Sequence, residues 1–311
     1  MPRYRVIHKT EYRYGDLVPA GHNLVHLRPR DTERQSCHNF KLTVQPEPAT
    51  LRQFVDFFGN RATWFSLQEP HRVLRMVTSS EVDVAPYSVP SDLPTIAWED
   101  VASMLEHATD PASLIARQFV FASQYVPRRP ELAEYARQSF LPGRPLFDAV
   151  QDLTLRINKE FIFDPSATTI GTPVLEVLKR RRGVCQDFAH LQIACLRSLG
   201  IPARYVSGYL LTRPPPGKPR MVGCDVSHAW LAAYLPRYGW IDFDPTNAVI
   251  PSGEHITLGW ARDYEDLAPV KGVITGGHQH TLKVSVDVEP LTTLGTLADS
   301  LSLIAARVPT P

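Results

Sequence analysis

Long hydrophobic runs are missing from this sequence of 311 residues. No stretch of about 18 apolar residues occurs, which excludes a transmembrane helix. The first residues, MPRYRVIHKTEYRYG, lack the apolar core of a secretory signal, so we expect no such signal. A charge bias is missing as well, because 33 basic and 32 acidic residues leave a net charge of +1. This balance disfavours nucleic acid and anionic membranes as partners, and nothing in the sequence indicates an oligomeric state.

Cysteine is also scarce. The four cysteines Cys37, Cys185, Cys195 and Cys224 are too few for a disulfide scaffold in a chain of this length. No CxxC pair is present, which weakens zinc and redox interpretations. We therefore expect a reducing, cytoplasmic setting that leaves a thiol free for chemistry, and no cofactor. What is present is ordinary: 43% hydrophobic and 21% charged residues, typical of a globular protein with a sizeable core.

The first hundred residues have the pattern of a β domain. Short apolar or alternating segments are separated by Pro, Gly, Asn and Asp, which predicts an antiparallel sandwich or barrel. The predicted strands are Tyr4–His8, Asn23–Leu27, Phe40–Val44, Ala62–Leu67, Leu74–Val77 and Ser80–Val84. The pair Gly59-Asn60 indicates a hairpin turn between two of them.

Helical spacing follows from about residue 110 to residue 199. Asp110-Pro111 and Thr172-Pro173 are typical helix starts, Phe147 to Phe161 repeats on one helical face, and a last helix from Cys185 ends before Gly200. Strands are then predicted again, at Ala203–Leu211, Ser227–Leu235, Trp240–Asp244 and Leu282–Val288. Helices followed by strands predict an α+β fold with an antiparallel sheet.

We expect three parts in this chain. Residues 1–98 are predicted to form the N-terminal β domain, folded separately and without catalytic residues. Residues 99–290 are predicted to form the catalytic domain, in which helices pack on an antiparallel sheet. Residues 291–311 are predicted to be a tail or a docked helix, because Leu294, Leu297, Leu301 and Ile304 have helical spacing.

The chemistry-bearing stretch is Gly183-Val184-Cys185-Gln186-Asp187. Here a cysteine opens a predicted helix, where the positive end of the helix dipole favours a thiolate. The basic run Lys179 to Arg182 adds positive potential. Such a thiolate is a nucleophile for amide chemistry, and the backbone N–H groups at the same helix end suit an oxyanion. A lone cysteine is more often simply a buried apolar residue.

A base and a carboxylate follow downstream. His228 lies on a predicted strand 43 residues after Cys185, and the next strand carries Asp242 and Asp244. Neighbouring antiparallel strands bring side chains to within about 5 Å at Cβ, close enough for a carboxylate to orient an imidazole. A thiol, a base and an orienting acid make a nucleophilic triad. The pattern alone does not separate the two acids, because alternate residues of a strand share a face.

Residues of about 150–250 resemble the core of the transglutaminase-like superfamily. The matching segments are Arg182 to Ala189, Leu196 to Tyr209, His228-Ala229-Trp230, and Gly239-Trp240 through Asp244-Pro245-Thr246-Asn247. The preceding β region is similar to the N-terminal domain of bacterial members, through Tyr12-x-Tyr14, Leu27-x-Pro29 and Phe58-Gly59-Asn60. The resemblance implies a papain-like fold and a triad of Cys185, His228 and Asp244, so it selects Asp244 over Asp242.

The function that the sequence predicts is that of a cysteine enzyme acting on amide bonds of a peptide or protein through an acyl-enzyme thioester. We favour a peptidase or amidase; transamidation of glutamine side chains by a transglutaminase is the alternative. A non-catalytic binding module is a further alternative, and so is a metal site using Cys185, Cys224 and His228, although no standard zinc spacing is complete. Trp230 and Trp240 flank the predicted site, and either is a candidate wall of a substrate groove.

Overall fold

The computed structural model describes residues 1–212 and 226–291. Its N-terminal part consists of strands. They are β1 (Arg3–Val18), β2 (Ala20–Val25), β3 (Gln35–Gln45), β4 (Thr50–Val55), β5 (Arg61–Leu67) and β6 (His71–Val84). In β1 the residues between Arg3 and Thr10 alternate between exposed and buried positions, as expected for a strand with one face on a core.

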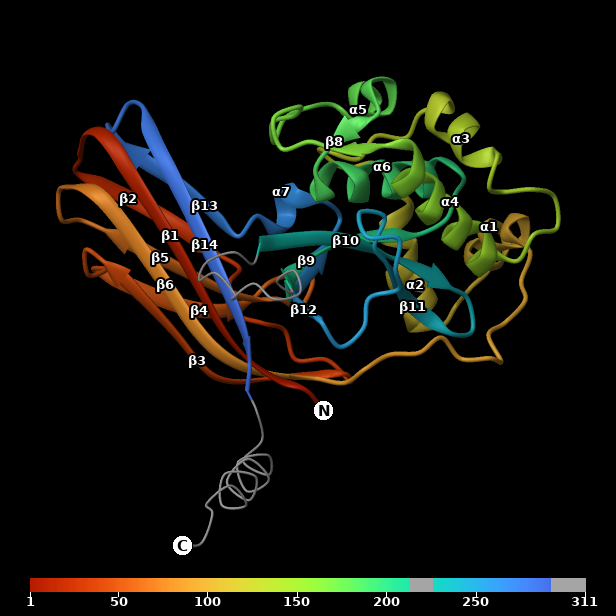
Figure 1. The fold of residues 1–311 in the computed structure, drawn as a ribbon, viewed down its shortest axis with the longest axis horizontal. Helices are drawn as coiled ribbons and strands as arrows, with labels where there is room; N and C mark the ends of the chain where they lie inside the picture. Colours follow the sequence, from red (N-terminus) through yellow and green to blue (C-terminus); the bar gives the residue numbers. More distant parts are fainter. Residues whose placement is uncertain (213–225, 292–311) are drawn as a thin grey trace, which may run out of the picture.

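Two four-stranded sheets form a sandwich at the left of Figure 1. One has the order β14-β1-β6-β3 and the other β13-β2-β5-β4. Both sheets contribute to a shared core that includes Val25, Phe65, Leu74 and Met76. The predicted β domain is therefore present, and the two segments predicted at Leu74–Val77 and Ser80–Val84 are parts of one continuous strand, β6.

The last two strands complete this sandwich from the other end of the chain. Strand β13 (Val270–Thr275) pairs with β2, and β14 (His280–Pro290) pairs with β1 along eleven residues from Tyr14 to Tyr4. The pairing differs from the expected division, which assigned residues 99–290 to the catalytic domain. Hydrogen bonding places β13 and β14 with the N-terminal strands, and short-range sequence patterns give no sign of such distant pairing. The division into separately folding domains stays a prediction.

Helices occupy the middle of the chain. They are α1 (Trp98–Glu106), α2 (Pro111–Arg117), the 3-10 helix η1 (Gln118–Val120), α3 (Pro130–Arg137), α4 (Leu146–Glu160), α5 (Val174–Arg180), α6 (Cys185–Ser198) and, later, α7 (Tyr264–Leu267). The predicted Asp110 cap of α2 is present, because its carboxylate accepts a hydrogen bond from the Ser113 N–H at 2.9 Å. Helices α1 and α3 were not predicted. None of the helices in the described ranges is long and apolar enough to cross a membrane.

A third four-stranded sheet, here called the central sheet, lies below helices α3 to α6 in Figure 1. Its order is β11-β10-β9-β12, made of β9 (Ala203–Leu210), β10 (Val226–Leu235), β11 (Gly239–Phe243) and β12 (His255–Ala261). Helix α6 is buried from Asp187 to Arg197 and packs on it through apolar residues shared with β9 and β10. Two short strands, β7 (Ile162–Phe163) and β8 (Arg182–Gly183), form a parallel pair just before α6.

The sandwich and the central sheet share an apolar interface. Tyr4, Val6 and Val286 of the sandwich pack with Tyr209 and Ile256 of the central sheet in one buried cluster. The predicted α+β fold, with a helix-covered antiparallel sheet preceded by a β-sandwich, is confirmed. The predicted C-terminal tail at 291–311 falls, beyond Leu291, outside the described residues.

Candidate active site

Helix α6 begins at Cys185 because the residues before it fix the backbone there. Asp187 is buried, and its Oδ2 accepts hydrogen bonds from the Val184 N–H at 2.8 Å and from the Thr168 hydroxyl at 2.6 Å. Gly183 leaves room for this carboxylate, since a Cβ at that position would lie 2.6 Å from Asp187 Oδ2. Burial raises the pKa of Asp187, partly offset by these hydrogen bonds. The half-buried Cys185 thus lies in the first turn of α6, at the positive end of the helix dipole.

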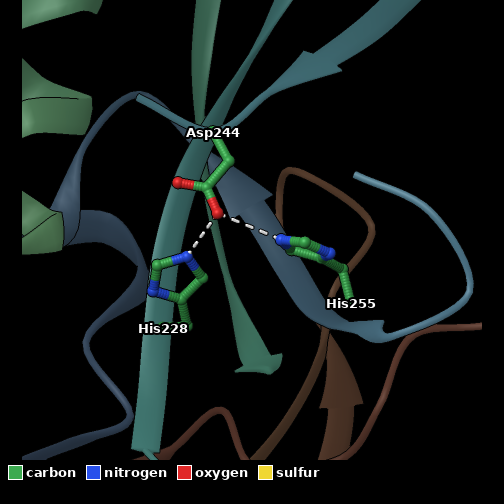
Figure 2. Close-up of side chains that lie close together, drawn as sticks. All are labelled: His228, Asp244 and His255. Carbon is green, nitrogen blue, oxygen red and sulfur yellow. Dashed lines mark hydrogen bonds and ion pairs between the residues drawn. The ribbon is translucent and has the colours of Figure 1, made fainter. Parts of the chain in front are cut away.

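His228 and Asp244 form the second part of the site (Figure 2). His228 Nε2 lies 2.7 Å from Asp244 Oδ2, and both side chains are buried. His228 comes from β10, and Asp244 directly follows β11. The Nε2 atom faces Asp244, which leaves Nδ1 as the ring nitrogen for a further partner, and Cys185 is close enough to His228 to contribute to raising its pKa. The structure therefore brings together the three residues of the predicted triad.

Strand register separates Asp244 from Asp242. In the β10–β11 pair Leu231 lies opposite Phe243 and Ala232 opposite Asp242. Asp242 is therefore one pair farther from His228 than Phe243, whereas Asp244 is one pair closer. Asp242 instead lies 4.0 Å from Arg34. The choice of Asp244 that the resemblance implied agrees with this register.

Hydrogen bonds from the residues after Asp244 fix the orientation of its carboxylate. Oδ1 accepts hydrogen bonds from the backbone N–H groups of Thr246 at 2.9 Å and Asn247 at 3.2 Å. The Asn247 side-chain amide donates to Oδ2 at 2.7 Å. The sequence Asp-Pro-Thr-Asn thus forms a turn in which the acid is bonded by the residues that follow it.

The charge state of the pair follows from these contacts. Burial lowers the pKa of His228, but its hydrogen bonds to Asp244 and Cys185 and the attraction of both groups outweigh burial and raise the pKa from 6.5 to about 10. Burial tends to raise the pKa of Asp244, yet hydrogen bonds from His228 and His255 hold it well below its usual range. At neutral pH the His228 imidazolium therefore faces the Asp244 carboxylate.

A second histidine contacts the same carboxylate oxygen, and sequence reasoning missed it. His255 Nε2 of β12 lies 3.1 Å from Asp244 Oδ2, and the side chain is buried (Figure 2). Its ring meets Trp230 edge-on at 5.2 Å between centroids. Strand β12 was not predicted at all. A lone histidine outside any motif carries no local signal of this contact, which arises only when β12 joins β9 in the central sheet.

The two predicted groove tryptophans occupy different places. Trp230 has no exposed surface and lies beside the rings of His228 and His255, so it supports the site from within. Trp240 is half-buried at the start of β11, opposite Tyr234, and stacks with Arg204 at 4.3 Å. It is thus several residue pairs away from His228 along β11.

Two further buried rings, those of His190 in α6 and Tyr205 in β9, lie against each other. His190 is buried, which lowers its pKa to about 4, and its Nε2 accepts a hydrogen bond from the Tyr264 N–H at 3.1 Å. The Tyr205 ring lies tilted against His190, with 5.0 Å between the ring centroids. Burial, with the nearby Cys185 as the next cause, raises the pKa of Tyr205 well above 10. At neutral pH His190 is therefore a neutral imidazole and Tyr205 a neutral phenol, and Tyr205 lies near Cys185.

His228, Asp244 and His255 are the only group in the described part of the chain that could hold a metal ion. The ligand atoms of His228, Asp244 and His255 lie within 4.8 Å of one another. A metal would have to replace the hydrogen bonds that already join both Nε2 atoms to Oδ2. The predicted metal alternative used Cys224, which lies outside the described residues. Of the other cysteines, Cys195 is buried and Cys37 is half-buried.

Comparisons with known proteins identify the family. Residues 4–83 match the bacterial transglutaminase-like N-terminal region, and residues 133–245 match the transglutaminase-like superfamily. An uncharacterised protein of Mycobacterium tuberculosis is 43% identical over 296 residues, which cover 93% of each chain. The chain belongs to the transglutaminase-like superfamily. It is thereby a member of a family of cysteine-based enzymes.

Two further relatives of this transglutaminase-like protein carry functional names. A candidate cysteine protease from Cytophaga hutchinsonii has the same fold, with a TM-score of 0.72 at 22% identity over 94% of this chain and 91% of that one. A protein-glutamine gamma-glutamyltransferase of Pseudomonas aeruginosa is 33% identical over 129 residues, 40% of this chain and 19% of that protein. The two names describe different reactions of an acyl group, namely hydrolysis and transfer to an amine.

Proposed function

We propose that Cys185, His228 and Asp244 are the catalytic triad of an enzyme that cleaves amide bonds of peptides or proteins through an acyl-enzyme thioester. The observation that carries the proposal is the buried His228–Asp244 pair, joined at 2.7 Å, with Cys185 at a helix start close enough to His228 to contribute to raising its pKa. Such a chain combines a nucleophile, a base and an orienting acid.

The steps follow from this arrangement. With the proton of the Cys185 thiol already held on the His228 imidazolium, the sulfur attacks the amide carbonyl carbon. The resulting oxyanion is placed near the backbone N–H groups at the start of α6. When the C–N bond breaks, the imidazolium returns the proton to the departing amine, leaving a thioester on Cys185. Asp244 holds the imidazole and stabilises its charged form.

The second half of the reaction decides the product. Water, deprotonated by His228, gives a carboxylic acid and a free thiol, whereas a primary amine gives a new amide. We propose hydrolysis as the main outcome, because it needs one substrate only. Transamidation is the second candidate, and the named Pseudomonas aeruginosa relative supports it. A cytoplasmic setting stays a prediction from the scarce cysteines.

The test uses a mixture of casein peptides with a fluorescent primary amine. Peptidase activity creates new α-amino groups, amidase activity releases ammonia without them, and transamidation incorporates the fluorescent amine. Cys185→Ala should abolish all three, and Cys37→Ala, a matched change at a half-buried thiol remote from the triad in sequence, should abolish none. Full activity of Cys185→Ala would refute the triad. Amine incorporation without new amino groups would replace hydrolysis by transamidation.

A further inference from the structure

Three donors surround one oxygen atom of Asp244. Oδ2 lies 2.7 Å from His228 Nε2, 2.7 Å from Asn247 Nδ2 and 3.1 Å from His255 Nε2. Figure 2 shows His228 and His255 approaching this oxygen from two different directions. Hydrogen bonds to an ionised group are stronger and more directional than neutral ones. The orientation of the acid, and through it that of His228, therefore depends on His255.

His255 is fixed by its strand, and that strand is at an edge. In the central sheet β12 pairs only with β9. On the other edge of β12, side chains of the sandwich form hydrogen bonds with backbone N–H and C=O groups of the strand. The Gln35 amide donates to the Thr257 carbonyl and accepts from the Thr257 N–H, both at 2.8 Å. The Asn60 amide does the same at Trp260, at 2.9 and 3.0 Å.

These two amides, here called the amide clamp, replace a neighbouring strand. Both are buried, and Asn60 is held by Asp56 and by the Arg30 guanidinium at 2.7 Å. Gly259 makes the close approach possible, since a Cβ there would lie 2.5 Å from Asn60 Oδ1. Each amide makes a reciprocal pair of hydrogen bonds with one residue of β12, which fixes the position of the strand along its length.

We propose that His255 is a positioning residue for Asp244, and that the N-terminal sandwich keeps it in place through the amide clamp of Gln35 and Asn60. The proposal rests on the proposed triad. It gives the sandwich a part in building the site, in contrast to the separable, non-catalytic domain expected from the sequence. A chain that begins after β6 would lose both clamp residues.

The first experiment varies His255 in the full chain. His255→Phe removes the N–H that faces Asp244, and His255→Gln keeps an N–H donor of similar reach. His255→Phe should lower kcat by roughly tenfold with KM within twofold, because a lost hydrogen bond to a charged group costs about one factor of ten or more. His255→Gln should restore most of kcat. The control pair, His38→Phe and His38→Gln, changes an exposed histidine on β3.

The outcomes separate the two proposals. If Cys185→Ala is inactive but His255→Phe keeps kcat within twofold, the triad stands and the role of His255 is refuted. Equal loss in His255→Phe and His255→Gln would also refute it, because the donor then does not matter. If Cys185→Ala remains active, the triad itself fails. Rates are divided by the fraction of folded protein, measured by urea unfolding.

The second experiment tests the clamp with a double-mutant cycle. Gln35→Leu removes the bonds to Thr257 and should lower kcat severalfold, again without a large change in KM. Gln53→Leu on the exposed strand β4 is the matched control and should have no effect. The double variant Gln35→Leu/His255→Phe should be no slower than His255→Phe alone, because both changes act through one contact. If the double variant lowers kcat by the product of the two single effects, the clamp does not act through His255.

Discussion

The two sides of Asp244 are built in different ways. On one side, His228 and Cys185 come from segments with strong local signals: a cysteine at a helix start and a histidine on a strand that turns back at Gly239. On the other side, His255 belongs to an edge strand that is held by residues more than 190 positions away. The comparison shows that the reacting groups are encoded by local motifs, whereas their support is encoded by long-range packing.

The largest effect is expected when the hydrogen bond between Asp244 and His228 is changed. Asp244→Asn should lower kcat by two orders of magnitude or more, because an amide cannot stabilise the imidazolium and also reverses one hydrogen bond. Asp242→Asn should change kcat by less than about tenfold, since Asp242 lies farther along β11 and next to Arg34. The rate of Cys185 acylation, with circular dichroism as the folding control, distinguishes them. A severe Asp242→Asn and a mild Asp244→Asn would contradict the register of the β10–β11 pair.

The next largest effect is a loss of stability, expected at Gly208 of β9, which lies between β10 and β12. Gly208 is paired with His228, and a Cβ there would lie 2.1 Å from the Ile256 carbonyl oxygen and 2.5 Å from the Trp230 ring. Gly208→Ala should therefore destabilise the fold by about 3 kcal/mol, since overpacking of this kind forces backbone shifts. Gly171→Ala is the control, because no described residue lies within 4 Å of the place that its Cβ would take. Urea unfolding of both variants checks the prediction, and equal stabilities would show that the central sheet can yield at Gly208.

The same contrast explains what the sequence could and could not predict. Helix α6 and strand β10 were predicted to within one residue or two, because a Gly-Ile-Pro stop ends the helix and a Pro-Arg-Tyr-Gly turn ends the strand. The β-sandwich was predicted, but the addition of β13 and β14 was missed, because strand partners more than 200 residues apart leave no short-range pattern. His255 and the amide clamp were missed for the same reason.

The pH dependence of the folding stability tests the charge states of His228 and Asp244. The pKa of His228 is raised from 6.5 to about 10 in the folded protein. The stabilisation from this group is therefore complete below about pH 6.5 and is lost as pH rises through about 10. The pKa of Asp244 is depressed, so its contribution is present above its unfolded value and is lost as pH falls through the folded one. We expect the stability difference between the wild type and His228→Gln to shrink between pH 7 and pH 10.5 in urea unfolding. A difference that stays constant over that range would contradict the raised pKa.

Alkylation should select Cys185 among the cysteines at low pH. Burial raises the pKa of Cys37 to about 11 and raises that of the buried Cys195 further. Both should therefore be thiols that react slowly near pH 6, whereas Cys185 is half-buried and lies near the imidazolium of His228. Iodoacetamide labelling followed by mass spectrometry should show modification at Cys185 at least tenfold faster than at Cys37. Equal rates, measured with His228→Gln as the control that removes the imidazolium, would contradict the assignment of the nucleophile.

The smallest expected effect concerns the two tryptophans, which the sequence did not distinguish. Trp240 contacts Arg204, Phe119 and Tyr234 at the far end of β11, so Trp240→Phe should leave kcat and KM within about twofold. Trp230 is fully buried against His228 and His255, so Trp230→Phe should lower stability by about 1–3 kcal/mol and reduce kcat more than KM. Steady-state kinetics with urea unfolding measures both. A tenfold rise in KM for Trp240→Phe would show that substrate reaches the start of β11, and would make Trp240 the groove wall that its position in the motif predicted.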